Sequence, residues 1–262
     1  MKLSISNIGW TEEQDGYVYN LMQKYGFSGL EIAPTRIFSK APYSQNKEAR
    51  KWSLKLKEQY GFTVSSMQSI WFGRNEKLFG TVKERQILID YTKNAIDFAA
   101  AIGCKNLVFG CPRNRNIPES VTPEEGITFF REIGDYAAEK KTVIGMEANP
   151  PIYNTNYINT TESALNLIED VDSAGFKLNL DLGTMIQNEE KIQSLKGKVK
   201  WMNHIHISEP GLKPIEYREM HRELMNLLEE EDYQNWVSIE MGKTEDIADV
   251  ERTMLYVKEI FG

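Results

Sequence analysis

Short apolar runs alternate with longer amphipathic stretches along the chain, and we count eight such pairs. The apolar runs are rich in Val, Ile, Leu or Phe and end at polar or turn-forming residues, a pattern typical of β-strands. The predicted strands are residues 2–7, 29–33, 63–68, 106–110, 142–147, 177–181, 201–208 and 236–240.

The stretches between these runs repeat apolar residues every three or four positions, which predicts helices that bury one face. One helix start is marked by Thr122 and Pro123, because Thr caps helix N-termini and Pro suits the first helical position. The predicted helices are residues 17–25, 47–60, 82–102, a helix from 122 onward, 161–174, 189–195, 215–230 and 245–261.

Regular alternation of strand and helix indicates parallel strands joined by helical crossovers. Eight repeats in 262 residues favour a closed (β/α)8 barrel, an α/β fold, formed by a single domain over residues 1–262. The alternative is an open, doubly wound sheet, which usually carries a Gly-rich phosphate loop after an early strand. The segment after the first predicted strand, Ile8-Gly9-Trp10-Thr11, is not such a loop. We therefore predict the barrel.

The last four predicted strands place Glu147, Asp181, His206 and Glu240 at or near their C-terminal ends. The active site of such a barrel lies at these ends, and neighbouring strands are only about 4.8 Å apart. Three converging carboxylates repel one another, and a divalent cation relieves that repulsion while the imidazole adds a nitrogen ligand. We predict one metal ion on these four residues, with Mn²⁺ preferred and Mg²⁺, Co²⁺ or Zn²⁺ as alternatives.

Other side chains near the strand ends are candidates for substrate contacts. Arg113 and Arg115 can bind a phosphate or carboxylate, although a solvated basic loop explains them equally well. Trp10 and Trp71 can stack on a sugar, or they can pack loops onto the barrel. The full set of these candidates is Asn7, Trp10, Glu31, Gln68, Trp71, Arg113, Arg115 and Lys213.

The chain has three histidines, and two of them share a strand. His204 precedes His206 by two residues, so both face the same side of the strand, with His204 one layer deeper. We expect His204 to be a hydrogen-bonded group behind the metal ligands. His221 falls within a predicted helix, where we expect it on the surface.

Several strand-end motifs together resemble the xylose-isomerase-like barrel superfamily, and more narrowly its sugar phosphate isomerase/epimerase group. That group includes ketose 3-epimerases, hydroxypyruvate isomerase, inosose dehydratase and dehydroshikimate dehydratase. The resemblance covers essentially the whole chain. It implies that Glu147 and Glu240 are also the catalytic acid/base pair, while Asp181 and His206 only bind the ion. The motifs are Gly29-Leu30-Glu31-Ile32, Gly145-Met146-Glu147, Leu180-Asp181, His204-Ile205-His206-Ile207-Ser208-Glu209 and Ile239-Glu240.

The chain departs from the ketose 3-epimerases at three substrate-binding positions. Thr184 replaces a histidine, the loop 149–154 lacks a glutamate, and Lys213 is only a loose substitute for an arginine. The resemblance therefore implies the metal chemistry of the ketose 3-epimerases for this chain, but not their substrate. Endonuclease IV shares the superfamily but needs a histidine-rich three-zinc site, which a chain with three histidines cannot provide.

These residues predict an isomerase or epimerase of a sugar, a sugar phosphate or a hydroxy-keto acid. It would remove a proton α to a carbonyl through a metal-stabilised enediolate. One alternative is a dehydratase, a lyase of the inosose or dehydroshikimate type. Another is a sugar-binding barrel without catalysis.

Composition narrows the partners and the compartment. The net charge of −7 and the absence of a basic patch argue against nucleic-acid and membrane partners, so we expect a small-molecule substrate. Cys104 and Cys111 flank a predicted strand, about 20 Å apart, too far for a disulfide. Free thiols and an N-terminal segment without a signal-peptide pattern predict a cytoplasmic protein. A homo-oligomer remains open.

Overall fold

Eight parallel strands close into one barrel in the computed structural model, which describes residues 1–262. The strands follow one another in chain order around the barrel, and β8 pairs with β1 to complete it. The (β/α)8 prediction is thus confirmed. The strands are β1 (Lys2–Ser6), β2 (Gly29–Ile32), β3 (Thr63–Met67), β4 (Leu107–Phe109), β5 (Ile144–Met146), β6 (Phe176–Asp181), β7 (Met202–Ser208) and β8 (Trp236–Glu240).

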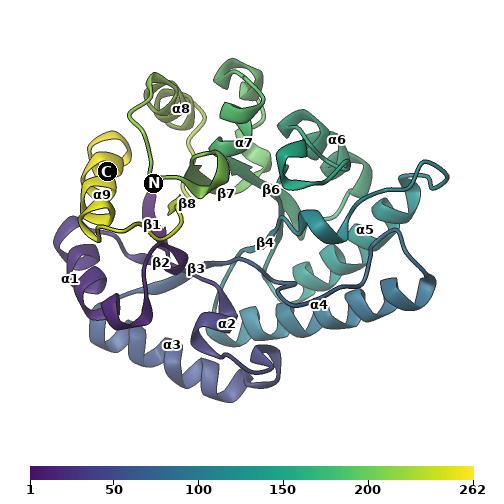
Figure 1. Ribbon diagram of the computed structural model, residues 1–262, viewed down its shortest axis with the longest axis horizontal. Coiled ribbons are helices and arrows are strands. Elements are labelled where there is room, and N and C mark those ends of the chain that lie inside the picture. The colour runs from purple at the N-terminus through teal and green to yellow at the C-terminus, as the bar shows by residue number, and fades with distance from the viewer.

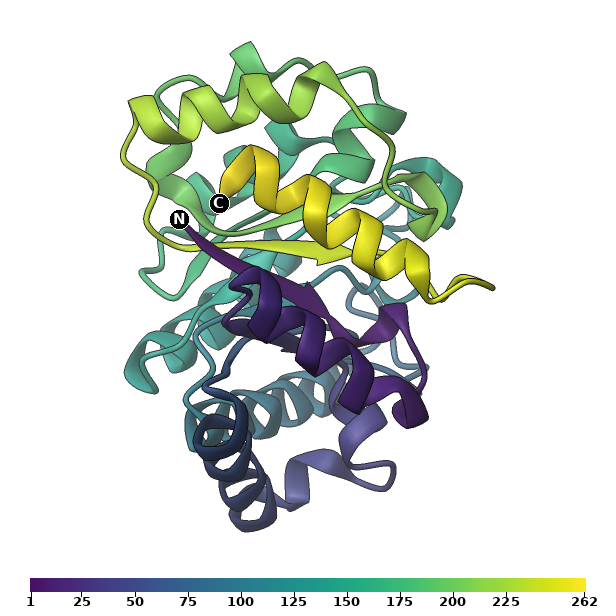
Figure 2. The same cartoon turned by 90° about the vertical axis from the view of Figure 1, so that its left-hand side faces the viewer.

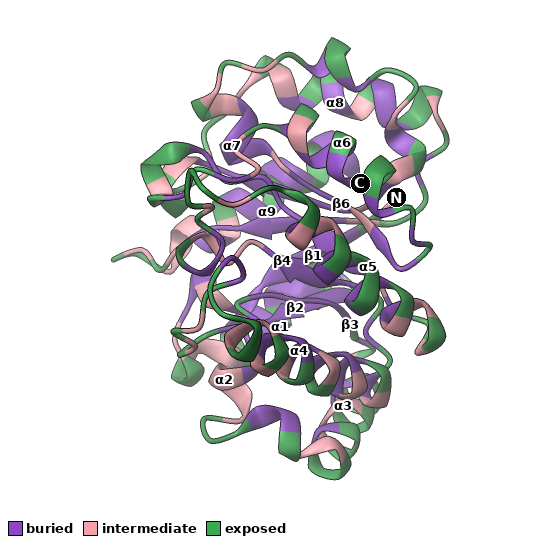
Figure 3. Cartoon of the chain, turned by 90° about the vertical axis from the view of Figure 1, so that its right-hand side faces the viewer, coloured by how far each residue is buried: buried purple, intermediate pink, exposed green.

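Helices surround the barrel, as Figure 1 shows. Their inward faces are buried against the strands and their outward faces are exposed (Figure 3). The amphipathic stripes in the sequence are therefore the surfaces that cover the barrel. The helices are α1 (Asp15–Tyr25), α2 (Pro34–Ile37), α3 (Asn46–Tyr60), α4 (Val82–Ile102), α5 (Glu124–Glu139), α6 (Thr161–Val171), α7 (Leu182–Gln187), α8 (Glu219–Glu230) and α9 (Ala248–Phe261).

The prediction of a helix at 189–195 is wrong. Helix α7 begins directly after β6, because the Asp181 carboxylate accepts a hydrogen bond from the Thr184 amide and caps the helix. Only a 3₁₀ turn, Ile192–Leu195, lies in the predicted range. Helix α5 also begins later than predicted, since Pro123 is the capping residue and not the first helical one.

Polar side chains occupy part of the barrel interior below the strand ends. The hydroxyls of Ser4 and Ser65 lie 2.6 Å apart, and the Asn106 side chain donates to the Ser66 hydroxyl and to the side-chain amide oxygen of Asn179. Barrel interiors are usually filled by branched apolar residues. Here a hydrogen-bonded layer supports the residues at the C-terminal ends of the strands.

The two ends of the chain lie close together beside β1 and α9, in both Figure 1 and Figure 2. Met1, Phe261 and Gly262 line the same surface hollow. Both cysteines are free, as predicted, with Cys104 buried and Cys111 half-buried. None of the helices has the length and apolar character needed to cross a membrane.

Candidate active site

The C-terminal ends of β5 to β8 bring Glu147, Asp181, His206 and Glu240 together. One potential ligand atom from each residue lies within 4.8 Å of those of the other three. The Nδ1 atom of His206 is 3.2 Å from Glu147 Oε2 and 3.1 Å from Glu240 Oε2. Glu147 lies one residue beyond β5, but its amide still donates to the carbonyl of Phe109 on β4, which keeps it in line with the strand ends.

The electrostatics of this cluster favour a bound cation. Burial and the nearby charge of Glu147 raise the pKa of Asp181 to about 6, and burial raises the pKa of Glu240 to about 7. Burial opposes charge on His206, but Glu240 and Glu31 raise its pKa well above the ordinary value. The buried carboxylates of Glu147 and Glu240, the half-buried carboxylate of Asp181 and one imidazole form a donor set that fits a divalent ion with mixed oxygen and nitrogen preference.

A small cavity of about 190 Å³ opens onto three of these side chains, Glu147, Asp181 and Glu240. Ligand pockets usually measure about 300–1,000 Å³, so this cavity suits a small molecule. No lysine or arginine lines it. The polar residues that complete its walls are Gln68, Ser69, Asn149, Tyr153, Ser208 and Glu209.

Amide side chains hold both oxygens of the Glu147 carboxylate. Asn149 Nδ2 donates to Oε1 at 2.9 Å, and Asn179 Nδ2 donates to Oε2 at 3.1 Å. The sequence prediction missed both residues. Asn179 could have been found, because it precedes Asp181 by two residues on β6 and therefore faces the same side, as His204 does relative to His206. Asn149 lies in a loop, where no such periodicity applies.

Arg115 does not reach the cavity, which corrects its expected role as a substrate contact. Its side chain is fully buried, with Nη1 donating to the Glu147 backbone oxygen at 2.9 Å. Nη2 donates to Asn149 Oδ1 at 3.1 Å and to the Ile158 carbonyl at 3.2 Å. Arg115 therefore fixes Asn149 and the loop after β5, and through Asn149 it supports the Glu147 carboxylate.

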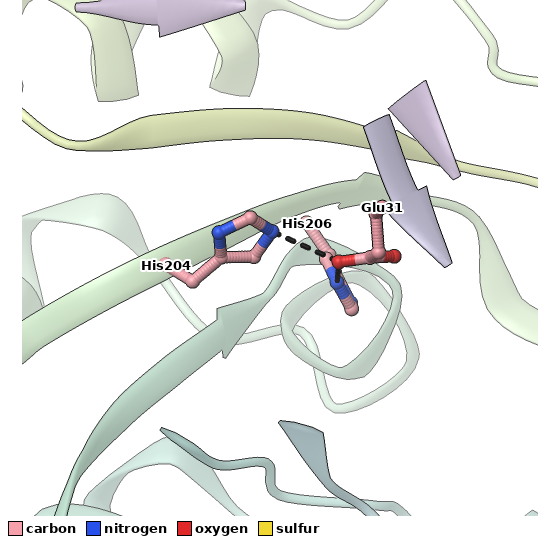
Figure 4. Close-up of side chains that lie close together, drawn as sticks. All are labelled: Glu31, His204 and His206. Atoms are coloured by element: carbon pink, nitrogen blue, oxygen red, sulfur yellow. Dashed lines mark hydrogen bonds and ion pairs between the residues drawn. The ribbon is translucent and has the colours of Figure 1, made fainter. Parts of the chain in front are cut away.

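Glu31 lies at the end of β2 and points toward the two histidines of β7 (Figure 4). Its Oε2 atom is 2.9 Å from His206 Nε2 and 3.0 Å from His204 Nε2. Burial alone would raise the pKa of Glu31, yet the two imidazoles lower it below its ordinary value. His204 is fully buried behind His206, as expected, but neither of its ring nitrogens has a partner in hydrogen-bond geometry.

Residues 19–259 match the family model described as the xylose isomerase-like TIM barrel. The chain belongs to this family. The match spans nearly the whole barrel, including all four converging residues. The resemblance inferred from the strand-end motifs is thereby confirmed.

Solved structures with the same barrel include sugar epimerases. The 3-keto-D-glucoside 4-epimerase from E. coli is 19% identical, with a TM-score of 0.75 over 99% of each chain. D-psicose 3-epimerase from Clostridium cellulolyticum H10, solved with D-tagatose, is 18% identical, with a TM-score of 0.76 over 100% of this chain and 99% of that one. A family 2 AP endonuclease from Brucella melitensis is 18% identical, with a TM-score of 0.74 over 98% of both. These identities establish the shared fold alone, and no curated protein sequence matches the chain.

Two aromatic side chains expected at the mouth of this xylose isomerase-like barrel are instead buried in packing. Trp10 donates from its indole nitrogen to Asp15 at 2.7 Å. Trp71 donates to the Thr92 hydroxyl at 2.8 Å and packs edge-on against Phe109. When its N–H has a hydrogen-bond partner, a tryptophan side chain is more stable with its ring packed in the interior than with the ring exposed on a loop. Neither tryptophan lines the cavity.

The other predicted substrate contacts divide between the cavity wall and its surroundings. Gln68 lines the cavity, whereas Asn7 is buried and accepts a hydrogen bond from the Ala33 amide at 2.9 Å. Glu31 lies behind the wall, in contact with the histidines. Arg113 and Lys213 are exposed and do not line the cavity, so the structure assigns neither to substrate binding.

Two further positions differ from expectation. The hydroxyl of Thr184 donates to the Ala148 carbonyl at 2.7 Å, so this residue ties α7 to the loop after β5 and does not face a substrate. His221 is not on the surface. It is buried between α8 and α9, with Nδ1 2.7 Å from the Tyr256 hydroxyl.

Proposed function

We propose that this protein is a divalent-cation-dependent epimerase or isomerase of a small, neutral sugar that carries a carbonyl group. The observation that carries the proposal is the convergence of Glu147, Asp181, His206 and Glu240 on one point beside a small cavity. The fold shared with 3-keto-D-glucoside 4-epimerase and D-psicose 3-epimerase supports the same class of reaction.

The four side chains would hold the ion, with Mn²⁺ preferred and Mg²⁺, Co²⁺ or Zn²⁺ as alternatives. When bound, a divalent cation supplies Lewis-acid polarisation of the substrate carbonyl and offsets the charge of the carboxylates. Asp181 and His206 act as ligands only. His206 is held from behind by Glu31, and Asp181 by the Ser208 hydroxyl and the Thr184 amide.

Glu147 and Glu240 both face the cavity, and they come from β5 and β8, the two ends of the four-strand set. One of them removes the proton from the carbon next to the carbonyl, and the other supplies a proton. Return to the opposite face of the same carbon inverts its configuration and gives the epimer. Return to the neighbouring carbon, together with transfer of the hydroxyl proton to the former carbonyl oxygen, moves the carbonyl and gives the isomer.

The charge of the cavity favours a neutral substrate. Four carboxylates line it, those of Glu147, Asp181, Glu209 and Glu240, and no cationic side chain does. Glu209 is already paired with Arg218, whose two nitrogens donate to it at 2.6 and 2.7 Å. A phosphate or carboxylate on the substrate would find no Lys or Arg partner, so an unphosphorylated sugar fits better than a sugar phosphate or a keto acid.

The first test is metal content by elemental analysis after purification without chelator, in wild type and in Asp181→Ala. We expect about one equivalent of a divalent metal in wild type and its loss in the variant. Glu139→Gln, 70% exposed at the end of α5, is the control and should keep the metal. Wild-type protein that binds no divalent metal even after soaking would contradict the proposal.

The second test is deuterium exchange from solvent into a panel of neutral ketoses and their phosphates, with the metal supplied. Wild type should label at least one neutral ketose, and Glu147→Gln and Glu240→Gln should each lower the rate by about 10²–10⁴-fold. Both variants should remain folded, and their metal content is measured at the same time because both residues are also proposed ligands. Label that appears only with loss of water would instead identify a dehydratase. Absence of exchange with every sugar would favour a binding protein.

A further inference from the structure

Glu31 is a fully buried carboxylate that contacts His206, one of the proposed ligands, and does not line the cavity. We propose that Glu31 is a positioning residue: it accepts a hydrogen bond from Nε2–H of His206 and thereby keeps the Nδ1 lone pair directed at the cation site. This inference rests on the proposed function, since it assigns a role to Glu31 only if His206 binds an ion.

The geometry around the His206 ring carries the argument. Nε2 is 2.9 Å from Glu31 Oε2, while Nδ1, on the other side of the ring, is 3.1–3.2 Å from the carboxylates of Glu147 and Glu240. A neutral imidazole has one donor nitrogen and one acceptor nitrogen. An ionised carboxylate only accepts, so Glu31 calls for the proton on Nε2. On the other side of the ring, the proposed cation would take the place of a proton between Nδ1 and the carboxylates of Glu147 and Glu240. Carboxylate partners of this kind orient metal-binding histidines in other proteins.

Glu31 is itself held in place by Gln68, which follows the neighbouring strand β3. β2 and β7 are separated by β8 and β1 around the barrel, so the Glu31 side chain must reach across its interior to meet the histidines. Gln68 Nε2 donates to Glu31 Oε1 at 3.2 Å and to the Ser6 hydroxyl at 2.7 Å. The Oε1 atom is thereby engaged, and Oε2 faces the imidazoles. Because Gln68 also lines the cavity, it links the cavity wall to His206 through Glu31.

His204 limits the movement of both partners. Its ring lies edge-on to that of His206, at 5.3 Å between centroids and 88° between planes (Figure 4). Its Nε2 atom is 3.0 Å from Glu31 Oε2 without forming a hydrogen bond. The same three residues could instead hold a second cation, which would use the unpartnered nitrogens of His204. That arrangement needs Nε2 of His206 without a proton, so the two accounts differ in whether Nε2 is protonated.

Nitrogen-15 NMR of the imidazoles in the wild-type protein loaded with diamagnetic Zn²⁺ distinguishes these tautomers without any substitution. The chain has only three histidines, which makes the assignment tractable. We expect His206 to carry its proton on Nε2, with the Nδ1 resonance shifted by the ion. A proton on Nδ1, or no proton on either nitrogen, would overturn the inference.

Equilibrium binding of Mn²⁺ measures the contribution of Glu31 independently of activity. Relative to wild type, Glu31→Gln should weaken binding about 10-fold, since its amide oxygen still accepts from Nε2–H, and Glu31→Leu about 100-fold. Asp15→Asn, which removes a half-buried carboxylate paired with Arg36 and outside the cavity, is the control and should bind within threefold of wild type.

The outcomes separate this inference from the proposed function. Wild type that binds no ion would overturn the proposed function and the role of Glu31 with it. Wild type that binds one ion, with both Glu31 variants unchanged, would overturn the role of Glu31 alone. A fall from two bound ions to one in Glu31→Gln would also overturn it, because Glu31 would then be a ligand. If Glu31→Leu does not fold, the Mn²⁺ affinity of Glu31→Gln and the tautomer of His206 in wild type still test the inference.

Discussion

At the scale of single residues, the proposed acid/base pair depends on neutral side chains that are not themselves reactive. Glu147 is held at both carboxylate oxygens by the amides of Asn149 and Asn179. Asn149 is in turn fixed by Arg115, a buried cation that never touches the cavity. The orientation of the Glu147 carboxylate therefore depends on the loops after β4 and β5 and on Asn179 of β6.

Asn149→Ala removes the middle of this chain of contacts. We expect the rate of deuterium exchange to fall about 10-fold, because Oε1 of Glu147 loses its donor and the carboxylate can rotate. The free energy of unfolding should fall by about 1–3 kcal/mol, since Arg115 Nη2 loses one acceptor inside the protein. Steady-state kinetics and urea unfolding measure the two effects. Asn94→Ala, an exposed amide on α4, is the control, and equal losses in both variants would refute the specific role.

The sequence predicted the four converging residues and failed for the residues on loops, and the difference is physical. A side chain at the end of a parallel strand has its direction fixed by the pleat, so Glu147, Asp181, His206 and Glu240 had to converge. Loop side chains follow local backbone geometry. Cys111 adopts a left-handed conformation with φ of 47°, and after this turn Arg115 points into the protein, which no hydrophobic pattern indicates.

At the scale of elements, the structure shows how closely helices approach the barrel. Residue Gly175 lies between α6 and β6, against the backbone of α5. A Cβ atom there would fall 2.1 Å from the Gly134 carbonyl and 2.5 Å from the Ala138 nitrogen. The sequence located both elements, but this contact arises from their packing. Helix α7 was missed for a related reason, since it begins at the capping residue Asp181 with no loop before it.

Gly175→Ala should therefore destabilise the fold by at least about 3 kcal/mol, because a helix backbone must shift to admit the methyl group. Gly16→Ala is the matched control: Gly16 lies within α1 with no atom within 4 Å of an added Cβ. That substitution should be neutral or stabilising by about 1 kcal/mol, as Ala favours the helix. Urea unfolding of both variants tests the pair, and similar midpoints would contradict the proposed close contact.

At the scale of the whole molecule, the candidate site reduces the stability of the ion-free protein. Burial raises the pKa of Asp181 to about 6 and that of Glu240 to about 7. A carboxyl group with a raised pKa in the folded state binds protons more tightly there than in the unfolded chain. For Glu240, the extra stability of the protonated folded state is fully present below the unfolded pKa of about 4.5. It is lost as the pH rises through the folded pKa of about 7.

Glu240→Gln should consequently make the ion-free protein more stable than wild type at pH 8, by about 1–3 kcal/mol, while abolishing turnover. At pH 4.5 the advantage should disappear, because Glu240 is then protonated in the folded wild type. Urea unfolding in the presence of chelator, at both pH values, measures the difference. An advantage of equal size at both pH values would show that packing, and not ionisation, is responsible.

The proximity of the two chain ends has a practical consequence. Met1 and Gly262 share one surface hollow at the N-terminal side of the strands, whereas the cavity opens at their C-terminal ends. Between the first and the last strand, β1 and β8, the barrel is closed by hydrogen bonds and not by a covalent link. A short peptide could join the ends, and the chain could be reopened in another surface loop, giving a circular permutant with the same barrel. A fusion partner or a tether to a solid support, attached at either end, would stand on the side away from the mouth and leave diffusion into it unobstructed.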